Sequence, residues 1–168
     1  THTVTPLIPD GVVGLFDMAD THIAYFKATL NDPGQLCVRD LVTGAETQLT
    51  NLNAWMNDIA LPQVEEVWFE GQDGNALQGW VMTPPNFDPT QTYPSILEIH
   101  GGPQAQYGFF FLHEFNYLAA NGYVVYFSNP RGGQGYGADH CRAIHGQWGT
   151  VDYDDLMVWA DYMTAQPY

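Results

Sequence analysis

Basic residues are scarce in this sequence of 168 residues, which has 4 lysines and arginines against 19 aspartates and glutamates. The formal net charge is −15 at pH 7. Only Lys27, Arg39, Arg131 and Arg142 could neutralise phosphate groups. We therefore expect no nucleic-acid partner, and we expect an acidic surface that favours solubility.

Long apolar runs are also missing, and cysteine is rare. No run approaches the length of about 18 residues that a membrane-spanning helix needs, and no signal peptide is recognisable. We expect no membrane contact and a cytoplasmic protein. For Cys37 and Cys141 we favour two reduced, buried thiols over one disulfide. The chain starts and stops in mid-pattern, so we expect a fragment that lacks its true N-terminus.

Residues 1–61 carry the pattern of short strands with tight turns. The stretches GVVGLFDMAD, HIAYFKATL, QLCVRDLVTG and AETQLT are separated by turn signals such as NDPG at 31–34. Four such strands are typical of one β-propeller blade, and a single blade needs neighbours to bury both of its faces. The alternative is a small β-meander that stands alone.

Residues 62–168 change to an α/β pattern. The segment VEEVWFEGQDGNALQGWVMTPP predicts an antiparallel hairpin, and SILEIHG and YVVYFSN predict strands buried on both faces. Helices are expected in FFFLHEFNYLAANG, which Gly122 ends, and in GTVDYDDLMVWADYMTAQPY. Their apolar positions are Phe111, Phe115, Leu118 and Ala119 in the first, and Leu156, Trp159, Ala160 and Met163 in the second. The predicted class is α/β, with only half of a domain present.

Two glycine-rich loops follow the two buried strands. Ligands bind beyond the carboxyl ends of strands in open α/β sheets, so HGGP at 100–103 and NPRGGQGYG at 129–137 should form one wall of a site. The N–H groups of Gly101 and Gly102 would suit an oxyanion hole. On these residues alone, a tight turn that needs a positive φ is an equal alternative.

Other chemical interpretations of the sequence are weaker. The run 133–138 fits G-x-G-x-x-A, but the dinucleotide pattern needs a strand, turn and helix context that is absent here. His140 and His145 are not spaced as metal ligands. The acidic trio at 152, 154 and 155 is read as helix capping, and Glu98 as ion-paired or at a strand end.

A serine nucleophile is absent from the sequence. The α/β-hydrolase elbow has the pattern G-x-S-x-G, and neither Ser95 in YPSIL nor Ser128 in FSNPR stands in it. A catalytic serine would therefore have to come from sequence outside these residues.

The motifs LEIHGGPQAQYG, AANGYVVYFSNPRGGQGYG and HGQWGTVDYDDLMVWADYMTAQPY together resemble the prolyl oligopeptidase family of serine peptidases. The acylaminoacyl-peptidase and dipeptidyl-peptidase-like branch is the most similar. The resemblance is strong over residues 65–168 and is only one of style over 11–60. It implies the last propeller blade at 1–61 and the N-terminal half of an α/β-hydrolase domain at 62–168.

The resemblance also implies roles for residues. Gly101 or Gly102 would supply the backbone oxyanion donor, and His100, where some branches have a tyrosine, would form the site wall. Structural roles near the site fall to the second loop, at Arg131, Gly132, Gly135 and Tyr136. The Ser, Asp and His of the triad would lie beyond Tyr168, so this chain alone should be inactive. The family needs no metal or cofactor, and its substrates are short peptides.

The chain should pair with the remainder of its own protein or a complementary fragment, because exposed sheet edges associate, and the full protein should be an oligomer. An esterase or lipase is the first alternative, since H-G-G also occurs in that wider group. A non-catalytic interaction module is the second.

Overall fold

Residues 3–168 are described by a computed structural model, in which the chain divides into two compact units. One unit contains the residues up to Ala60 together with Gly108–His113, and the other contains Leu61–Tyr107 and Glu114–Tyr168. Within the described part of the chain, every helix is too short or too polar to cross a membrane.

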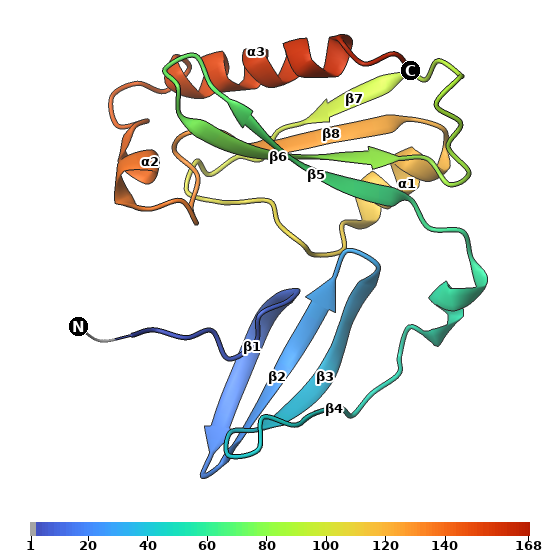
Figure 1. Cartoon of the computed structure of the whole chain (residues 1–168), viewed down its shortest axis with the longest axis vertical. Coiled ribbons are helices and arrows are strands. Elements are labelled where there is room, and N and C mark those ends of the chain that lie inside the picture. Colours follow the sequence, from blue (N-terminus) through green and yellow to red (C-terminus); the bar gives the residue numbers. More distant parts are fainter. Residues whose placement is uncertain (1–2) are drawn as a thin grey trace. The chain divides into compact units, whose positions relative to one another are not determined.

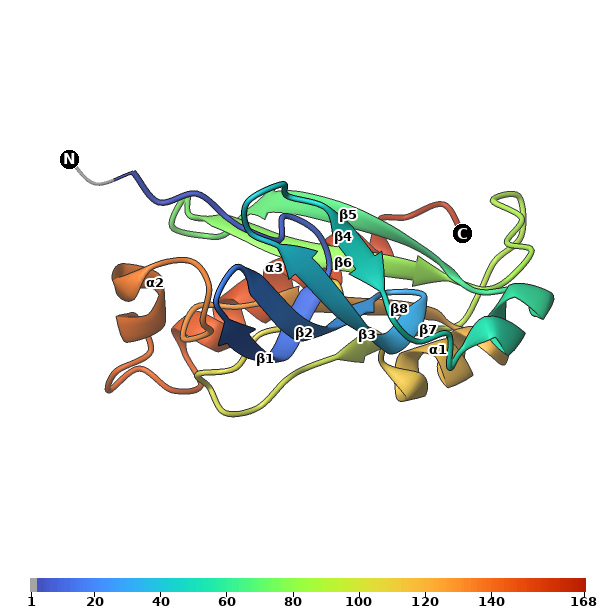
Figure 2. The ribbon, with the colours of Figure 1, turned by 90° about the horizontal axis from the view of Figure 1, so that it is seen from below.

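The first unit is built on a four-stranded antiparallel meander. Its strands are β1 (Val12–Ala19), β2 (His22–Thr29), β3 (Asp32–Asp40) and β4 (Glu46–Gln48), and they lie side by side in chain order (Figure 2). The strands of the predicted blade are thus present. A 3₁₀ helix at Ala54–Asp58, which the sequence did not predict, follows them.

The core of this sheet is small. Ile23, Tyr25 and Cys37 are buried together, whereas Leu15 and Phe16 on β1 are 84% and 64% exposed. Cys37 and Cys141 are both free thiols; the first is buried, as predicted, and the second is only half-buried. A sheet that exposes large apolar side chains has spare surface for another layer.

The second unit contains a mixed four-stranded sheet with the order β5-β6-β8-β7 (Figure 1). The predicted hairpin is formed by β5 (Gln63–Glu70) and β6 (Ala76–Thr83), while β7 (Ser95–Glu98) runs parallel to β8 (Val124–Asn129). All six residues of β8 are buried, because β6 and β7 pair with its two edges and side chains of α1 and α3 pack on its two faces. The fold is mixed α/β, as predicted.

Helices cover both faces of this sheet (Figure 1). On one face, Trp159 of α3 (Val151–Thr164) packs against Tyr126, with ring centroids 5.9 Å apart. On the other, Phe115 of α1 (His113–Ala120) packs against Phe127 at 4.9 Å. Neighbouring strand residues point to opposite faces, so the two helices lie on opposite sides of β8.

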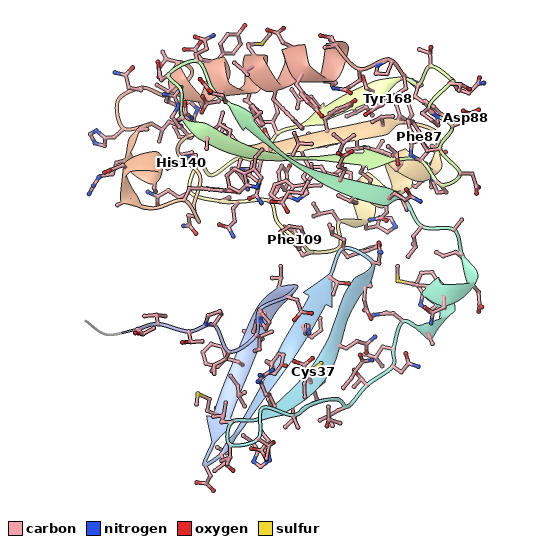
Figure 3. The ribbon with its side chains drawn as sticks, in the orientation of Figure 1. Cys37, Phe87, Asp88, Phe109, His140 and Tyr168 are labelled. Carbon is pink, nitrogen blue, oxygen red and sulfur yellow. The ribbon has the colours of Figure 1, made fainter. Side chains whose placement is uncertain are left out.

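The end of the chain packs on the α3 side of the sheet. The ring of Tyr168 meets that of Phe87 edge-on, with centroids 4.9 Å apart (Figure 3). Both side chains contact the buried cluster of Val81, Val124, Tyr126 and Trp159. This cluster is the main core beneath α3.

The structure corrects four details of the sequence prediction. β7 is not buried on both faces, because Ser95 is exposed and its other three residues are only half-buried. The helix α1 begins at His113, so Phe111 precedes it. The turn predicted at 31–34 falls at 30–31, because Asp32 already pairs with Thr29. A short helix, α2 (Ala138–Arg142), was not predicted.

Candidate active site

The two glycine-rich loops meet beyond the carboxyl ends of β7 and β8. Glu98 pairs with Phe127, so the parallel strands end nearly level with one another. The first loop begins with the HGGP turn and runs over residues 100–107. The N–H of Gln134 in the second loop donates a hydrogen bond of 3.0 Å to the carbonyl of Ala105 in this first loop. The sequence prediction that both loops contribute to one wall is therefore matched by a direct main-chain link.

The HGGP turn presents backbone N–H groups without internal partners. Within residues 3–168, the N–H groups of Gly101 and Gly102 donate no hydrogen bond to another residue, and both glycines are exposed. Gly102 has φ +138°, a conformation that side chains disfavour, and an added Cβ would lie 3.2 Å from the Cβ and the N atom of Ala105. Two unpaired donors beside each other can bind an anionic oxygen.

A cavity of about 250 Å³ opens beside this turn. Its walls come from both loops and from the segment that leads into α3, and they include His100, Gly102, Gly133, Ile144, Trp148 and Leu156. Trp148 is 70% exposed, so one wall is an aromatic ring open to solvent. The space is large enough for a small acyl group or an amino-acid side chain.

His100 forms part of this wall but is not connected to an acid. Its Nδ1 lies 3.3 Å from the carbonyl oxygen of Gly101, and its ring meets Tyr107 edge-on at 5.0 Å. Its Nε2 is buried and has no hydrogen-bond partner among the described residues. His100 therefore shapes the pocket. Among the described residues no carboxylate holds its ring, as a catalytic base of the serine-peptidase type would require.

Arg131 fastens the second loop to α3. Its guanidinium donates to both carboxylate oxygens of Asp155, at 2.8–3.1 Å, and its backbone N–H donates to Asp155 at 2.9 Å. A second ion pair joins it to Asp73. The hydrogen bonds that Arg131 donates to the Asp155 carboxylate hold the pKa of its guanidinium above its usual range, so the group stays charged.

The role of Asp155 corrects the reading of the acidic trio. Asp152 does accept the N–H of Gly149, at 2.8 Å, near the helix start, but Asp155 is buried and does not cap. The sequence held a signal for this, because Asp155 lies four residues before the buried Trp159 and so shares its helix face. A buried acid on an apolar stripe requires a buried cation, and Arg131 is that partner.

The other loop residues have local structural roles. Gly132 adopts φ +104°, and a Cβ there would lie 2.8–2.9 Å from Ile144. Gly135 lies against Gln106 of the first loop. The hydroxyl of Tyr136 accepts from Asn129 at 2.6 Å and donates to Gln78. These residues surround the site without presenting groups to its cavity.

The remaining candidate residues do not line the cavity. Ser95 starts β7 at the end opposite the loops, and Ser128 is buried within β8. Glu98 ends β7, as expected. Its pKa is raised mainly by burial, and to a smaller extent by repulsion from the carboxylate of Glu114. No cluster of three or more metal-ligating side chains occurs among residues 3–168.

His140 supports the second loop from α2 (Figure 3). Its Nε2 lies 3.0 Å from the carbonyl oxygen of Pro130, so this nitrogen carries the proton and donates. Burial lowers the pKa of its imidazole below the usual value of 6.5. The unfolded state therefore binds a proton more readily than the folded state.

A pH dependence of stability follows from His140. Well above pH 6.5 the imidazole is neutral in both states, so it adds no dependence on pH. As the pH falls from 6.5 toward the lower folded-state pKa, the free energy of unfolding should decrease, and below that pKa it should level off. Urea unfolding of the native protein and of His140→Gln, which keeps a donor, should diverge across this window. Parallel pH profiles would contradict the assignment.

Known proteins match this chain over the loops and much of the fold. The sequence profile of the Prolyl oligopeptidase family matches residues 109–168. The peptidase YuxL of Bacillus subtilis is 43% identical over 113 residues, which are 67% of this chain and 17% of that protein. Dipeptidyl-peptidase 5 of Porphyromonas endodontalis is 32% identical over 159 residues, or 91% of this chain and 23% of that one.

Solved structures agree with the sequence matches. The acylaminoacyl peptidase of Pyrococcus horikoshii matches with a TM-score of 0.81 and 30% identity, covering 90% of this chain and 24% of its own. Dipeptidyl peptidase 4 of Porphyromonas gingivalis, at 23% identity, matches in fold with a TM-score of 0.81, over 98% of this chain and 24% of that one.

The class that these matches define is that of the serine-type peptidases. The chain belongs to the prolyl oligopeptidase family, as the sequence motifs predicted, and it spans between a sixth and a quarter of the relatives' length.

Proposed function

We propose that this chain supplies the oxyanion side of the active site of a serine peptidase that hydrolyses short peptides. The observation that carries the proposal is the pair of unpaired N–H groups at Gly101 and Gly102 beside a cavity of about 250 Å³. During acyl transfer the scissile carbonyl oxygen becomes an anion. Preorganised donors stabilise it, each typically by about 2.7–4 kcal/mol.

The proposal includes an organisation of the chain. Residues 62–168 would be the N-terminal half of an α/β-hydrolase domain, supported by the mixed sheet with helices on both faces. Residues 1–61 would be a propeller blade, supported by the four-stranded meander and by the exposed apolar side chains of β1. Neighbouring blades would cover those side chains.

The nucleophile, acid and base would come from other parts of the full-length enzyme. Neither Ser95 nor Ser128 is placed to attack a substrate in the cavity. The 168 residues therefore offer the oxyanion donors and a pocket, but no serine that could accept the acyl group. The 168 residues alone should therefore bind no covalent acyl group. His100 and Trp148 would contact the substrate, and Arg131 would hold the second loop in place.

Hydrolysis assays on the full-length enzyme and on the isolated 168 residues test this function. The full-length enzyme should cleave acylaminoacyl- or dipeptidyl-anilides and lose that activity on labelling with a fluorophosphonate, while the isolated residues should do neither. Turnover of p-nitrophenyl esters without any anilide cleavage would favour an esterase. If the full-length protein neither cleaves nor reacts, the interaction-module alternative replaces the peptidase.

A further inference from the structure

Asn129 joins the sheet to the first loop through its side-chain amide. It is the last residue of β8 and is 1% exposed. Its Oδ1 accepts the backbone N–H of Tyr107 at 2.7 Å, and its Nδ2 donates to the backbone carbonyl of the same residue at 2.9 Å. One amide thus pairs with both main-chain groups of a residue 22 positions away in sequence.

The orientation of this amide is fixed by its partners. A backbone N–H can only donate and a carbonyl can only accept, so Oδ1 and Nδ2 cannot exchange places. The second proton of Nδ2 goes to the hydroxyl of Tyr136, at 2.6 Å. Both donors and one acceptor of the buried side chain are therefore used, as a buried polar group requires.

We propose that Asn129 is a positioning residue for the oxyanion turn, because it fixes Tyr107 and thereby sets where the N–H groups of Gly101 and Gly102 point. This inference rests on the proposed function of that turn. It adds a residue that touches neither the substrate nor the donors.

The contacts of the first loop show how Asn129 can act on Gly101 and Gly102 through Tyr107. The N–H groups of Gly101 and Gly102 donate no hydrogen bond within residues 3–168, so their position depends on the residues that flank them. On the carboxyl side, the loop is held at Ala105 by Gln134 and at Tyr107 by Asn129. The fixed ring of Tyr107 then meets His100, which directly precedes Gly101.

The ring of Tyr107 is packed between other aromatic rings. It contacts Phe115 and Phe127 edge-on, with centroids 5.3 and 5.5 Å apart. The pKa of its hydroxyl is raised to about 12, mainly by burial and further by the nearby carboxylates of Glu98 and Glu114. The hydroxyl therefore stays neutral at physiological pH. Tyr107 is thus a rigid link between the Asn129 amide and the start of the turn.

Only an amide of this length fits the arrangement. An aspartate could still accept the Tyr107 N–H, but when ionised it would oppose the Tyr107 carbonyl with no proton to donate. An alanine would leave both main-chain groups of Tyr107 without partners. A displacement of about 1 Å in a catalytic group can cost about 10²-fold in rate, so loss of the contact should be visible in kcat.

The test is steady-state kinetics of Asn129→Ala in the full-length enzyme with a peptide anilide. Rates are divided by the number of serines that react with a fluorophosphonate, which removes any loss of folded protein. We expect kcat to fall about 10- to 100-fold with KM within about threefold, because the donors act in the transition state. Deuterium uptake should rise in peptides spanning 100–108 and stay unchanged in β6.

Gln78→Leu is the matched control. It removes the acceptor of the Tyr136 hydroxyl in the same hydrogen-bond network, together with the bond that Gln78 donates to Glu66, and it should leave both contacts between Asn129 and Tyr107 in place. Its kcat per reactive serine should stay within about twofold of the native value, even if its melting temperature falls. If Asn129→Ala does not fold, Asn129→Asp preserves the shape and should show the same loss of kcat.

The outcomes separate this inference from the proposed function. A native enzyme without peptide hydrolysis would overturn the function itself. An active native enzyme whose folded Asn129 variants keep native kcat would overturn the positioning role alone. If Gln78→Leu loses as much kcat as Asn129→Ala, or if neither Asn129 variant folds, the residue acts through general stability and the positioning role is rejected.

Discussion

Replacing Gly102 with valine in the full-length enzyme is expected to lower kcat by about 10²–10³-fold, the usual cost of one lost oxyanion donor. Valine cannot easily adopt φ +138°, and its Cβ would lie 3.2 Å from Ala105. The turn must rotate to relieve this strain, and its N–H then no longer points toward the developing anion. KM should change little, because the donor acts in the transition state.

Gly122→Val provides the control for strain alone. Gly122 has φ +90° with open space around it, and it lies in the turn before β8, at the end opposite the loops. It should lose stability to a similar extent, of about 1–3 kcal/mol, while kcat per reactive serine stays near native. If Gly102→Val folds and keeps native kcat, the oxyanion assignment is wrong.

Breaking the ion pair of Arg131 should produce the largest loss of stability. Asp155 is 1% exposed, so Arg131→Met leaves a buried carboxylate without its cation, which typically costs about 3–5 kcal/mol. The second loop also loses its anchor on α3, so we expect activity to fall together with the melting temperature. Thermal unfolding followed by circular dichroism would measure the first effect and anilide hydrolysis the second.

Two variants make the test specific. Asp73→Ala removes the other partner of Arg131, but Asp73 is 69% exposed, and solvated pairs contribute only about 0–1 kcal/mol. The double variant Arg131→Met with Asp155→Leu should recover much of the lost stability, since no charge then remains buried. Equal losses for Asp73→Ala and Arg131→Met would show that burial does not decide the strength of this interaction.

The strands and helices were predictable because their apolar patterns are local. The run YVVYFSN is apolar at nearly every position, and it forms the most buried strand of the second sheet. SILEIHG has the same character, yet it forms β7, which pairs on one side only in the described residues. Composition indicates that a strand tolerates burial, but pairing with neighbours far along the chain decides whether it is buried.

The candidate site was predictable only where a motif carries its own geometry. Successive glycines after a strand indicated Gly101 and Gly102 as candidate backbone donors, with a tight turn as the equal alternative. Asn129 gave no comparable signal, and Asp155 gave only its position on the Trp159 face of α3, because each acts through a partner more than 20 residues away. Their roles depend on how β8 and α3 place them, which the order of residues does not display.

The main-chain link between the two loops has a consequence for laboratory evolution. Ala105 and Gln134 are joined by the carbonyl of one and the N–H of the other, so the link does not require any particular side chain at position 134. Gln104 and Gln134 are both exposed. A combinatorial library at these two positions can therefore vary the side chains that directly follow the pocket residues Pro103 and Gly133, while the backbone link between the loops is preserved.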